Sequence, residues 1–129
     1  MCATRVEAQV YYVSSGMGVA KEKSAVYESG YVDIAPSFPG GERALIDYIN
    51  ETRRYPSRAF EKKVQGRVRC RFVVDVDGTI NAISVIKGVE QSLDEEAVRI
   101  IREMPKWEAA ILNGRPVPVY YVLAIPFRL

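Results

Sequence analysis

Apolar and polar residues alternate in the middle of the chain. The apolar positions are Val68, Cys70, Phe72, Val74 and Val76, and the positions between them are Arg67, Arg69, Arg71, Val73 and Asp75. A period of two is typical of a strand with one buried face, so residues 65–76 are predicted to form a strand. Asp77-Gly78 then interrupts the pattern. Because this dipeptide accepts the positive φ angles of a type I′ turn, residues 79–87 are predicted to fold back as the second strand of a hairpin.

Two segments have the periodicity of amphipathic helices. Residues 42–52 follow a Pro-Gly-Gly turn and end before Tyr55-Pro56, and Pro56 can open a further short helical turn that includes Ala59 and Phe60. Residues 92–104 are stopped by Pro105, and Ser92 with Glu95 has the spacing of a capping box. The predicted buried positions are Leu45, Tyr48, Ile49 and Thr52 in the first helix and Leu93, Ala97, Ile100, Ile101 and Met104 in the second.

The last segment, residues 117–129, alternates again and is predicted to be a third strand after an Asn113-Gly114 turn. Pro116 precedes it, and it contains Pro118 and Pro126. Since prolines within sheets are confined to edges, starts and bulges, we place this strand at an edge of the sheet. The economical order is second, first, third strand. The predicted fold class is α+β, with two helices packed on a three-stranded sheet in the order helix–strand–strand–helix–strand.

The chain is predicted to divide into an N-terminal arm, residues 1–35, and one domain, residues 36–129. Residues 6–13 are β-prone, but Ser14-Ser-Gly-Met-Gly18 interrupts this pattern and residues 21–24 are polar, so the arm is interpreted as flexible or loosely attached. Cys2 follows Met1, and bacterial lipoproteins begin, after processing, with a lipid-modified cysteine, but no signal sequence precedes Cys2, so an incidental residue is the preferred interpretation. No run of about eighteen apolar residues predicts a membrane-spanning helix.

Composition narrows the chemistry that the chain could carry out. With 48% hydrophobic and 26% charged residues it has the make-up of an ordinary globular domain. It has no histidine and two cysteines without metal-ligand spacing, so no metal site and no cofactor is expected. No nucleophile, P-loop or dinucleotide motif is present, which argues against an enzyme. Cys70 and the single tryptophan, Trp107, are predicted to be core residues.

Positive charge is concentrated in one segment although the net charge is only +2. Residues 53–71 contain eight basic residues and one acid, Glu61. The row Arg67, Arg69, Arg71 would suit phosphate contacts, but arginine stems packed along a solvated sheet face explain it better, so no nucleic-acid partner is predicted. Peptidoglycan or the acidic end of a peptide could also meet this row, and the residues leave that choice open.

The ordered set of motifs from Pro36 to Leu129 resembles the C-terminal domain of TonB, the energy-transducing protein of Gram-negative bacteria. The motifs are Pro36-Ser-Phe-Pro-Gly-Gly-Glu42, Tyr55-Pro56, Gln65-Gly-Arg-Val68, Phe72-Val-Val, Asp77-Gly78, Ala97, Met104-Pro-Lys-Trp107, Gly114-Arg-Pro-Val117 and Phe127-Arg-Leu129. This resemblance implies a periplasmic domain that captures the TonB box, a short N-terminal peptide of outer-membrane transporters, by adding it to an edge strand. It also implies coupling to the proton-driven proteins ExbB and ExbD through a membrane segment, which this chain does not contain.

By this resemblance the peptide-binding surface maps onto the last strand and two nearby positions. The residues are Tyr55, Pro56, Gln65, Val119, Tyr120, Tyr121, Val122, Leu123, Ala124 and Ile125. The family pattern has a proline nearer the middle of this strand, and its place at Pro126 here could change which amides are free for a peptide. The chain is either a fragment of a transducer or a stand-alone protein of TonB type.

A second interpretation is a structural or self-associating protein. The edge strand would then pair with residues 6–13 of its own arm or with the last strand of a second copy, giving a homodimer. Peptide capture is the preferred interpretation because the last strand has an edge that an extended peptide can join.

Overall fold

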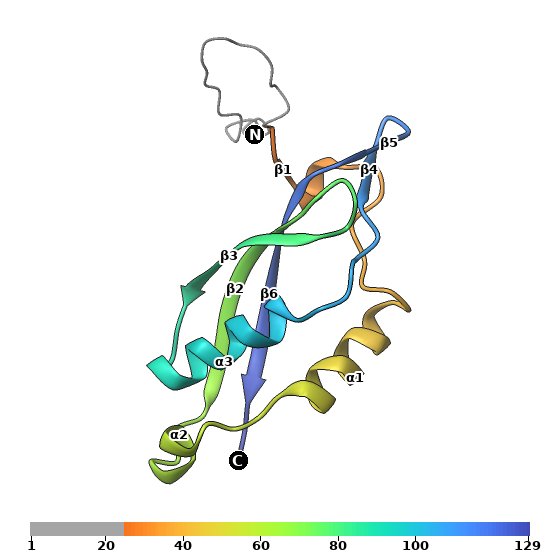
Figure 1. Ribbon diagram of the computed structural model, residues 1–129. Coiled ribbons are helices and arrows are strands. Elements are labelled where there is room, and N and C mark those ends of the chain that lie inside the picture. The colour runs from red at the N-terminus through yellow and green to blue at the C-terminus, as the bar shows by residue number, and fades with distance from the viewer. Residues whose placement is uncertain (1–24) are drawn as a thin grey trace.

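The computed structural model describes residues 25–129 (Figure 1). The β-prone segment at residues 6–13 and Cys2 lie outside this range, so the predictions about them stay predictions. No helix in the described range is long and apolar enough to cross a membrane.

A mixed sheet forms the centre of the fold, with β2 (Gly66–Val74), β3 (Ile80–Lys87) and β6 (Val119–Phe127) as its long strands. β2 lies between the other two and is antiparallel to both, which confirms the predicted order. A fourth strand that the sequence did not predict, β1 (Tyr27–Glu28), pairs parallel with the first two residues of β6. β6 is therefore an outer strand only beyond Tyr120 in the described part of the chain.

Helices α1 (Glu42–Thr52) and α3 (Gln91–Arg102) cover one face of this sheet, and the short α2 (Ser57–Glu61) lies beside the start of β2 (Figure 1). α1 has the predicted bounds, and α2 includes Ala59 and Phe60 as predicted. α3 begins one residue before the predicted start and ends at Arg102, two residues before the predicted end at Met104. The Tyr48 hydroxyl donates to the Ile100 carbonyl at 2.8 Å and joins the two covering helices. A 3₁₀ turn, η3 (Ser29–Tyr31), follows β1, and a small hairpin of β4 (Ala110–Leu112) and β5 (Arg115–Val117) turns at Asn113-Gly114 as predicted.

The core lies between the sheet and the two covering helices, and the alternation of the strands explains why. In the three long strands, the fully buried residues are Val68, Cys70, Phe72 and Val74 of β2 and Val119 and Ile125 of β6, with Phe127 almost as buried. They pack on Leu45 and Ile49 of α1 and on Leu93, Ala97, Ile100 and Ile101 of α3. The predicted burial of these six helix residues is thus confirmed. Tyr48, Thr52 and Met104, which were also predicted to be buried, are only partly buried, and Met104 lies after the end of α3. Val76, which the alternation also placed inside, is exposed because β2 has ended before it.

Trp107 is a core residue, as predicted. Its ring is 4% exposed and makes edge contacts with Phe38, Phe72 and Tyr121 at centroid distances of 5.0 to 5.9 Å. Cys70 is also buried, and burial raises the pKa of its thiol to about 11.

The turn between β2 and β3 is not type I′, because Gly78 has a positive φ and Asp77 does not. The Asp75 amide donates to the Thr79 carbonyl, and the Gly78 amide donates to the Asp75 carbonyl, each at 2.9 Å. These bonds define a three-residue loop with glycine at the left-handed position. The Asp77 carboxylate accepts from both the amide and the hydroxyl of Thr79, which holds Asp77 in its place and lowers the pKa of that carboxyl.

The predicted capping box at the start of α3 is also wrong. The N-cap is Glu90, whose carboxylate accepts from the Ser92 amide at 3.1 Å and from the Ser92 hydroxyl. Glu95 instead accepts from the Gln91 side chain one turn away. The helix begins one residue before Ser92 because the Glu90 carboxylate accepts from the Ser92 amide, the donor that the Glu95 side chain was expected to satisfy.

Candidate peptide-binding edge

The outer edge of β6 is set by how β6 pairs with β2. In an antiparallel ladder, residues that exchange hydrogen bonds with one neighbour alternate with residues whose amide and carbonyl point to the other side. Two carbonyls show which residues point outward: the Pro118 carbonyl accepts from Tyr27 of β1 at 3.1 Å, and the Pro126 carbonyl accepts from the Arg53 guanidinium at 3.1 Å. The even-numbered residues of β6 therefore direct their backbone groups away from β2.

Both ends of this edge are occupied. β1 pairs with Val119 and Tyr120 and ends there, because the chain turns into the 3₁₀ turn at Ser29. At the other end Pro126 has no amide hydrogen, and its carbonyl already accepts from Arg53.

Val122 and Ala124 lie between these ends. Within residues 25–129 no strand pairs with β6 on its outer side after Tyr120, so the outward amides and carbonyls of Val122 and Ala124 have no partner strand. An unpaired edge of this kind is a template for an added strand. The edge open to a partner is short, and we call residues 121–125 the open edge.

The predicted residues of β6 thus divide into two groups. The backbone groups of Val119, Tyr121, Leu123 and Ile125 face β2, whereas those of Tyr120, Val122 and Ala124 face outward. The side chain of Tyr121 packs on Phe72 and Trp107, and burial raises the pKa of its hydroxyl. Tyr121 therefore packs β6 against the core on the helix side of the sheet, and its ring is not available to a peptide.

Among residues 25–129, no helix lies on the other face of the sheet. We call it the helix-free face, and its residues are Arg67, Arg69, Arg71 and Val73 of β2, Asn81, Ser84 and Lys87 of β3, and Tyr120, Val122, Ala124 and Pro126 of β6. None of them belongs to the core cluster. Val122 is 50% exposed on this face, and the Arg71 guanidinium carbon lies 4.2 Å from the centre of the Tyr120 ring.

The predicted flanking residues gather at the C-terminal end of β6. Tyr55 makes an edge contact with Phe127 at 5.8 Å between ring centres, and its hydroxyl donates to the Val64 carbonyl. Pro56 is the N-cap of α2. The Gln65 side chain accepts from the Leu129 amide at 2.8 Å, so it extends the pairing of β6 with β2 and does not lie on the outer edge.

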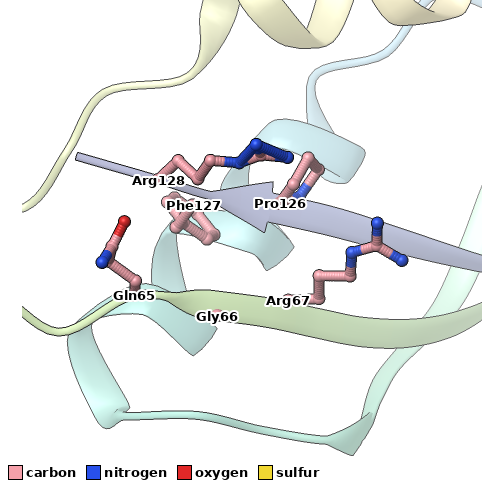
Figure 2. Close-up of a pocket in the computed structure, with 6 residues that line it drawn as sticks. All are labelled: Gln65, Gly66, Arg67, Pro126, Phe127 and Arg128. Atoms are coloured by element: carbon pink, nitrogen blue, oxygen red, sulfur yellow. The ribbon is translucent and has the colours of Figure 1, made fainter.

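A hollow of about 290 Å³ lies at this end, between the last residues of β6 and the first of β2 (Figure 2). Its lining is Gln65, Gly66, Arg67, Pro126, Phe127 and Arg128. The sequence prediction missed Arg53, which closes the open edge, and Arg67 and Arg128, which line this hollow. Arg67 was visible in the basic row, but no spacing in the sequence places Arg53 beside Pro126.

The described residues offer no grouping of His, Cys, Asp and Glu that could hold a metal ion. The absence of a cofactor stays a prediction. What the arrangement offers to a partner is backbone hydrogen bonding at the open edge and positive charge on the helix-free face.

Comparison with known proteins identifies the family. The model of the family described as Gram-negative bacterial TonB protein C-terminal matches residues 51–129. No curated protein sequence matches the chain. Two solution structures of the Helicobacter pylori TonB C-terminal domain are similar in fold. One has 24% identity and a TM-score of 0.51 over 64% of this chain and 75% of that one; the other has 22% identity and a TM-score of 0.50 over 66% and 89%.

The chain has the α+β fold of a TonB C-terminal domain. Domains of this family are periplasmic protein-interaction domains of Gram-negative bacteria, and the family is a non-catalytic one. The family match covers more than half of the chain, so the chain belongs to the TonB C-terminal family. The expected family is confirmed.

Proposed function

We propose that this domain captures the TonB box of an outer-membrane transporter as an added strand beside residues 121–125 of β6. The observation that carries the proposal is the pair of outward amides and carbonyls at Val122 and Ala124, which have no partner strand in the described part of the chain. Strand addition obtains its affinity from such main-chain bonds. In the periplasm, this capture would pass energy from ExbB and ExbD to the transporter through a membrane segment outside this chain.

The two occupied ends limit the peptide. β1 blocks an added strand at Val119 and Tyr120, and Arg53 with Pro126 ends the ladder. About five peptide residues fit beside residues 121–125, since paired strands have the same rise per residue. Tyr55 and Pro56 come two and three residues after Arg53 in the chain, so they are proposed to contact residues of the peptide beyond this stretch rather than its centre.

The experiment that tests this proposal is an NMR titration of the labelled chain with N-terminal peptides of outer-membrane transporters from its own genome. Saturable shifts are expected at the Val122 and Ala124 amides, with smaller shifts near Tyr55. Val122→Pro removes one outward amide and leaves the bonds to β2 in place, so it should weaken binding at least about tenfold. Val122→Thr keeps the amide and the branched shape, and should bind within about twofold of the parent chain.

The proposal is wrong if no transporter peptide shifts the two amides, or if both variants bind a peptide as the parent chain does. In that case, hydrogen exchange of the free chain shows whether the edge is already occupied. Val122 and Ala124 amides that are already protected in the free chain would mean that another segment or another copy occupies the edge.

Self-association is the second candidate function, and β1 is the observation that favours it. This segment of the chain already adds a short strand to β6. A homodimer joined through the open edge would sediment as a dimer at micromolar concentration, and Val122→Pro would convert it to a monomer. We favour peptide capture, because β1 pairs only with Val119 and Tyr120 and does not reach Val122 and Ala124.

A further inference from the structure

One cross-strand row joins the open edge to the basic residues of the sheet. Ala124 of β6 is directly opposite Arg69 of β2, and Arg69 is directly opposite Lys87 of β3. Residues directly opposite each other have side chains on the same face, which here is the helix-free face. A peptide residue paired with Ala124 would extend this row by one position and point its side chain to the same face.

A hollow of about 390 Å³ lies over this row. Its lining is Arg67, Arg69, Lys87, Gly88, Val89 and Ala124, which come from all three long strands and the residues after β3. Three of these residues are cations and none is an acid. No ion pair or side-chain hydrogen bond is formed by Arg67, Arg69 or Lys87 with any residue in the range 25–129.

The small size of Ala124 opens the path from the edge into this hollow. An added strand would lie about 10 Å from β2, two strand spacings away, with only the methyl group of Ala124 between its side chain and Arg69. Long side chains reach neighbours about 7–8 Å away on one face of a sheet, and here the peptide side chain and Arg69 would extend toward each other over this methyl group. In Figure 2 the Arg67 side chain extends from β2 toward β6. It therefore points toward the side from which a peptide added to β6 would approach.

The neighbouring row has a different character. Val122 is opposite Arg71, but the Arg71 guanidinium is placed over the Tyr120 ring, and Val122 presents exposed apolar surface. A peptide residue two positions from the one that faces Ala124 would therefore meet an apolar side chain. A peptide that suits both rows would therefore carry one acid and one apolar residue, two positions apart, on the same side.

An acidic peptide fits this face better than a nucleic acid does. Nucleic-acid surfaces that lack sequence preference combine a long basic track with free aromatic rings for base stacking. Here the hollow has the volume of a few side chains, and the ring of Tyr120 is already covered by Arg71. Carboxylates accept paired bonds from guanidinium groups, and the edge beside Ala124 offers the main-chain bonds that hold a peptide.

We propose that Arg69, with Lys87 and Arg67, forms a carboxylate-binding subsite that selects a glutamate or aspartate at the peptide position paired with Ala124. This proposal rests on the proposed function, because it takes the peptide to be an added strand on β6. The subsite would set which extended peptides the open edge accepts.

The experiment uses the full 129-residue chain and two acetylated, amidated heptapeptide probes. One is Thr-Val-Thr-Glu-Thr-Val-Thr, and the other has glutamine in place of glutamate. Glutamate and the two valines share one side of the extended peptide, so the probe can place the acid opposite Ala124 and a valine opposite Val122. Binding is followed by NMR shifts of the Val122 and Ala124 amides and by fluorescence anisotropy of labelled probes.

The glutamate probe is expected to bind about tenfold more tightly than the glutamine probe at low salt, because the acid gains charge-assisted bonds. The preference should shrink as sodium chloride is raised, since the hollow is open to solvent. The double variant Arg69→Gln/Lys87→Gln should bind both probes equally. Arg43→Gln/Arg115→Gln removes the same charge from α1 and β5 and should keep the preference.

Three results would overturn the proposal in distinguishable ways. Equal binding of both probes to the parent chain, with shifts at Val122 and Ala124, would leave strand addition intact and disprove the subsite. No shift at these amides with either probe or with the transporter peptides would disprove the proposed function as well. Tighter binding of short oligothymidylate than of the glutamate probe, lost in Arg69→Gln/Lys87→Gln, would make the row a nucleic-acid site.

Discussion

At the scale of single residues, Gly78 connects the hairpin to the segment that carries the core tryptophan. Its carbonyl accepts from the Trp107 amide at 2.8 Å, and its φ is +88°. A methyl group added here would lie 1.9 Å from the Trp107 carbonyl oxygen. The position therefore requires glycine both for its backbone conformation and for its close approach.

Gly78→Ala should lower the free energy of unfolding by about 3 kcal/mol or more, because backbone strain and the clash with Trp107 add. Gly114→Ala is the matched control: Gly114 has a φ of +78°, but a methyl group there meets nothing within 4 Å. It should cost only about 1 kcal/mol. Urea unfolding of both variants measures the difference, and equal losses would mean that the contact with Trp107 contributes nothing.

The Cys70 thiol is predicted to be unreactive in the folded chain. It is fully buried, and burial raises its pKa to about 11, so almost no thiolate is present at neutral pH. In a Cys2→Ser background, labelling with a thiol-specific disulfide reagent should proceed at the rate of global unfolding and accelerate with urea. Rapid labelling without denaturant would show that the strand opens locally.

At the scale of elements, Glu96 ties α3 to the end of α1. Its carboxylate accepts from the Arg54 amide at 2.8 Å and from two nitrogens of Arg99, at 2.8 and 2.7 Å. Arg99 in turn donates to the Thr52 carbonyl at 2.9 Å. Although burial opposes it, these donors hold the pKa of Glu96 below its usual value. The folded state therefore favours the ionised carboxylate.

A group whose pKa is lowered by folding contributes stability at pH values above its unfolded pKa, and the contribution is lost as the pH falls through the folded value. Stability should thus decline as the pH falls below the usual glutamate pKa of 4.5. Glu96→Gln should cost about 1 kcal/mol at pH 7, since part of the network is solvent-screened, and should flatten this acid decline.

Thermal unfolding between pH 3 and pH 7 measures both effects of the Glu96 substitution. Asp47→Asn is the control, because the Arg43–Asp47 pair is long, at 3.9 Å, and exposed. It should change stability little at any pH. If the stability of Glu96→Gln fell at low pH as much as that of the parent chain, the loss of stability in acid would come from other carboxylates.

At the scale of the whole molecule, β1 sets where the open edge begins. It adds two residues to the outer side of β6 and belongs to the segment before the matched family region. Deleting residues 1–28 should leave a cooperative fold, because the buried core cluster lies entirely within residues 38–127. The same deletion should uncover the outward backbone groups of Tyr120.

Hydrogen exchange and peptide titration of this truncated chain test the role of β1. The Tyr120 amide should exchange faster, while Tyr121, which faces β2, should not change. Peptide-induced shifts should extend from Val122 and Ala124 to Tyr120. A footprint that still stops at Val122 would mean that β1 does not limit the peptide.

The sequence alone determined the elements that have strong periodicity. The alternation of β2, the helical faces of α1 and α3, the Asn113-Gly114 hairpin and the burial of Cys70 and Trp107 all follow from local patterns of apolar residues and turn-forming dipeptides. The prolines around β6 indicated an outer strand, and the ordered motifs indicated the family. These features depend on residues close together in the chain, so one sequence is enough to read them.

Tertiary structure decided which atoms the edge offers. β1 covers the start of β6, and Arg53 closes its end from 73 residues away, and neither contact has a sequence signal. The turn type at Gly78 and the N-cap at Glu90 were likewise decided by which of several competing hydrogen bonds forms. Residue propensities do not predict the outcome of that competition. The row from Ala124 through Arg69 to Lys87 exists only once the register of three strands is fixed. A shift of one residue would turn every side chain to the other face, so register decides what the edge can bind.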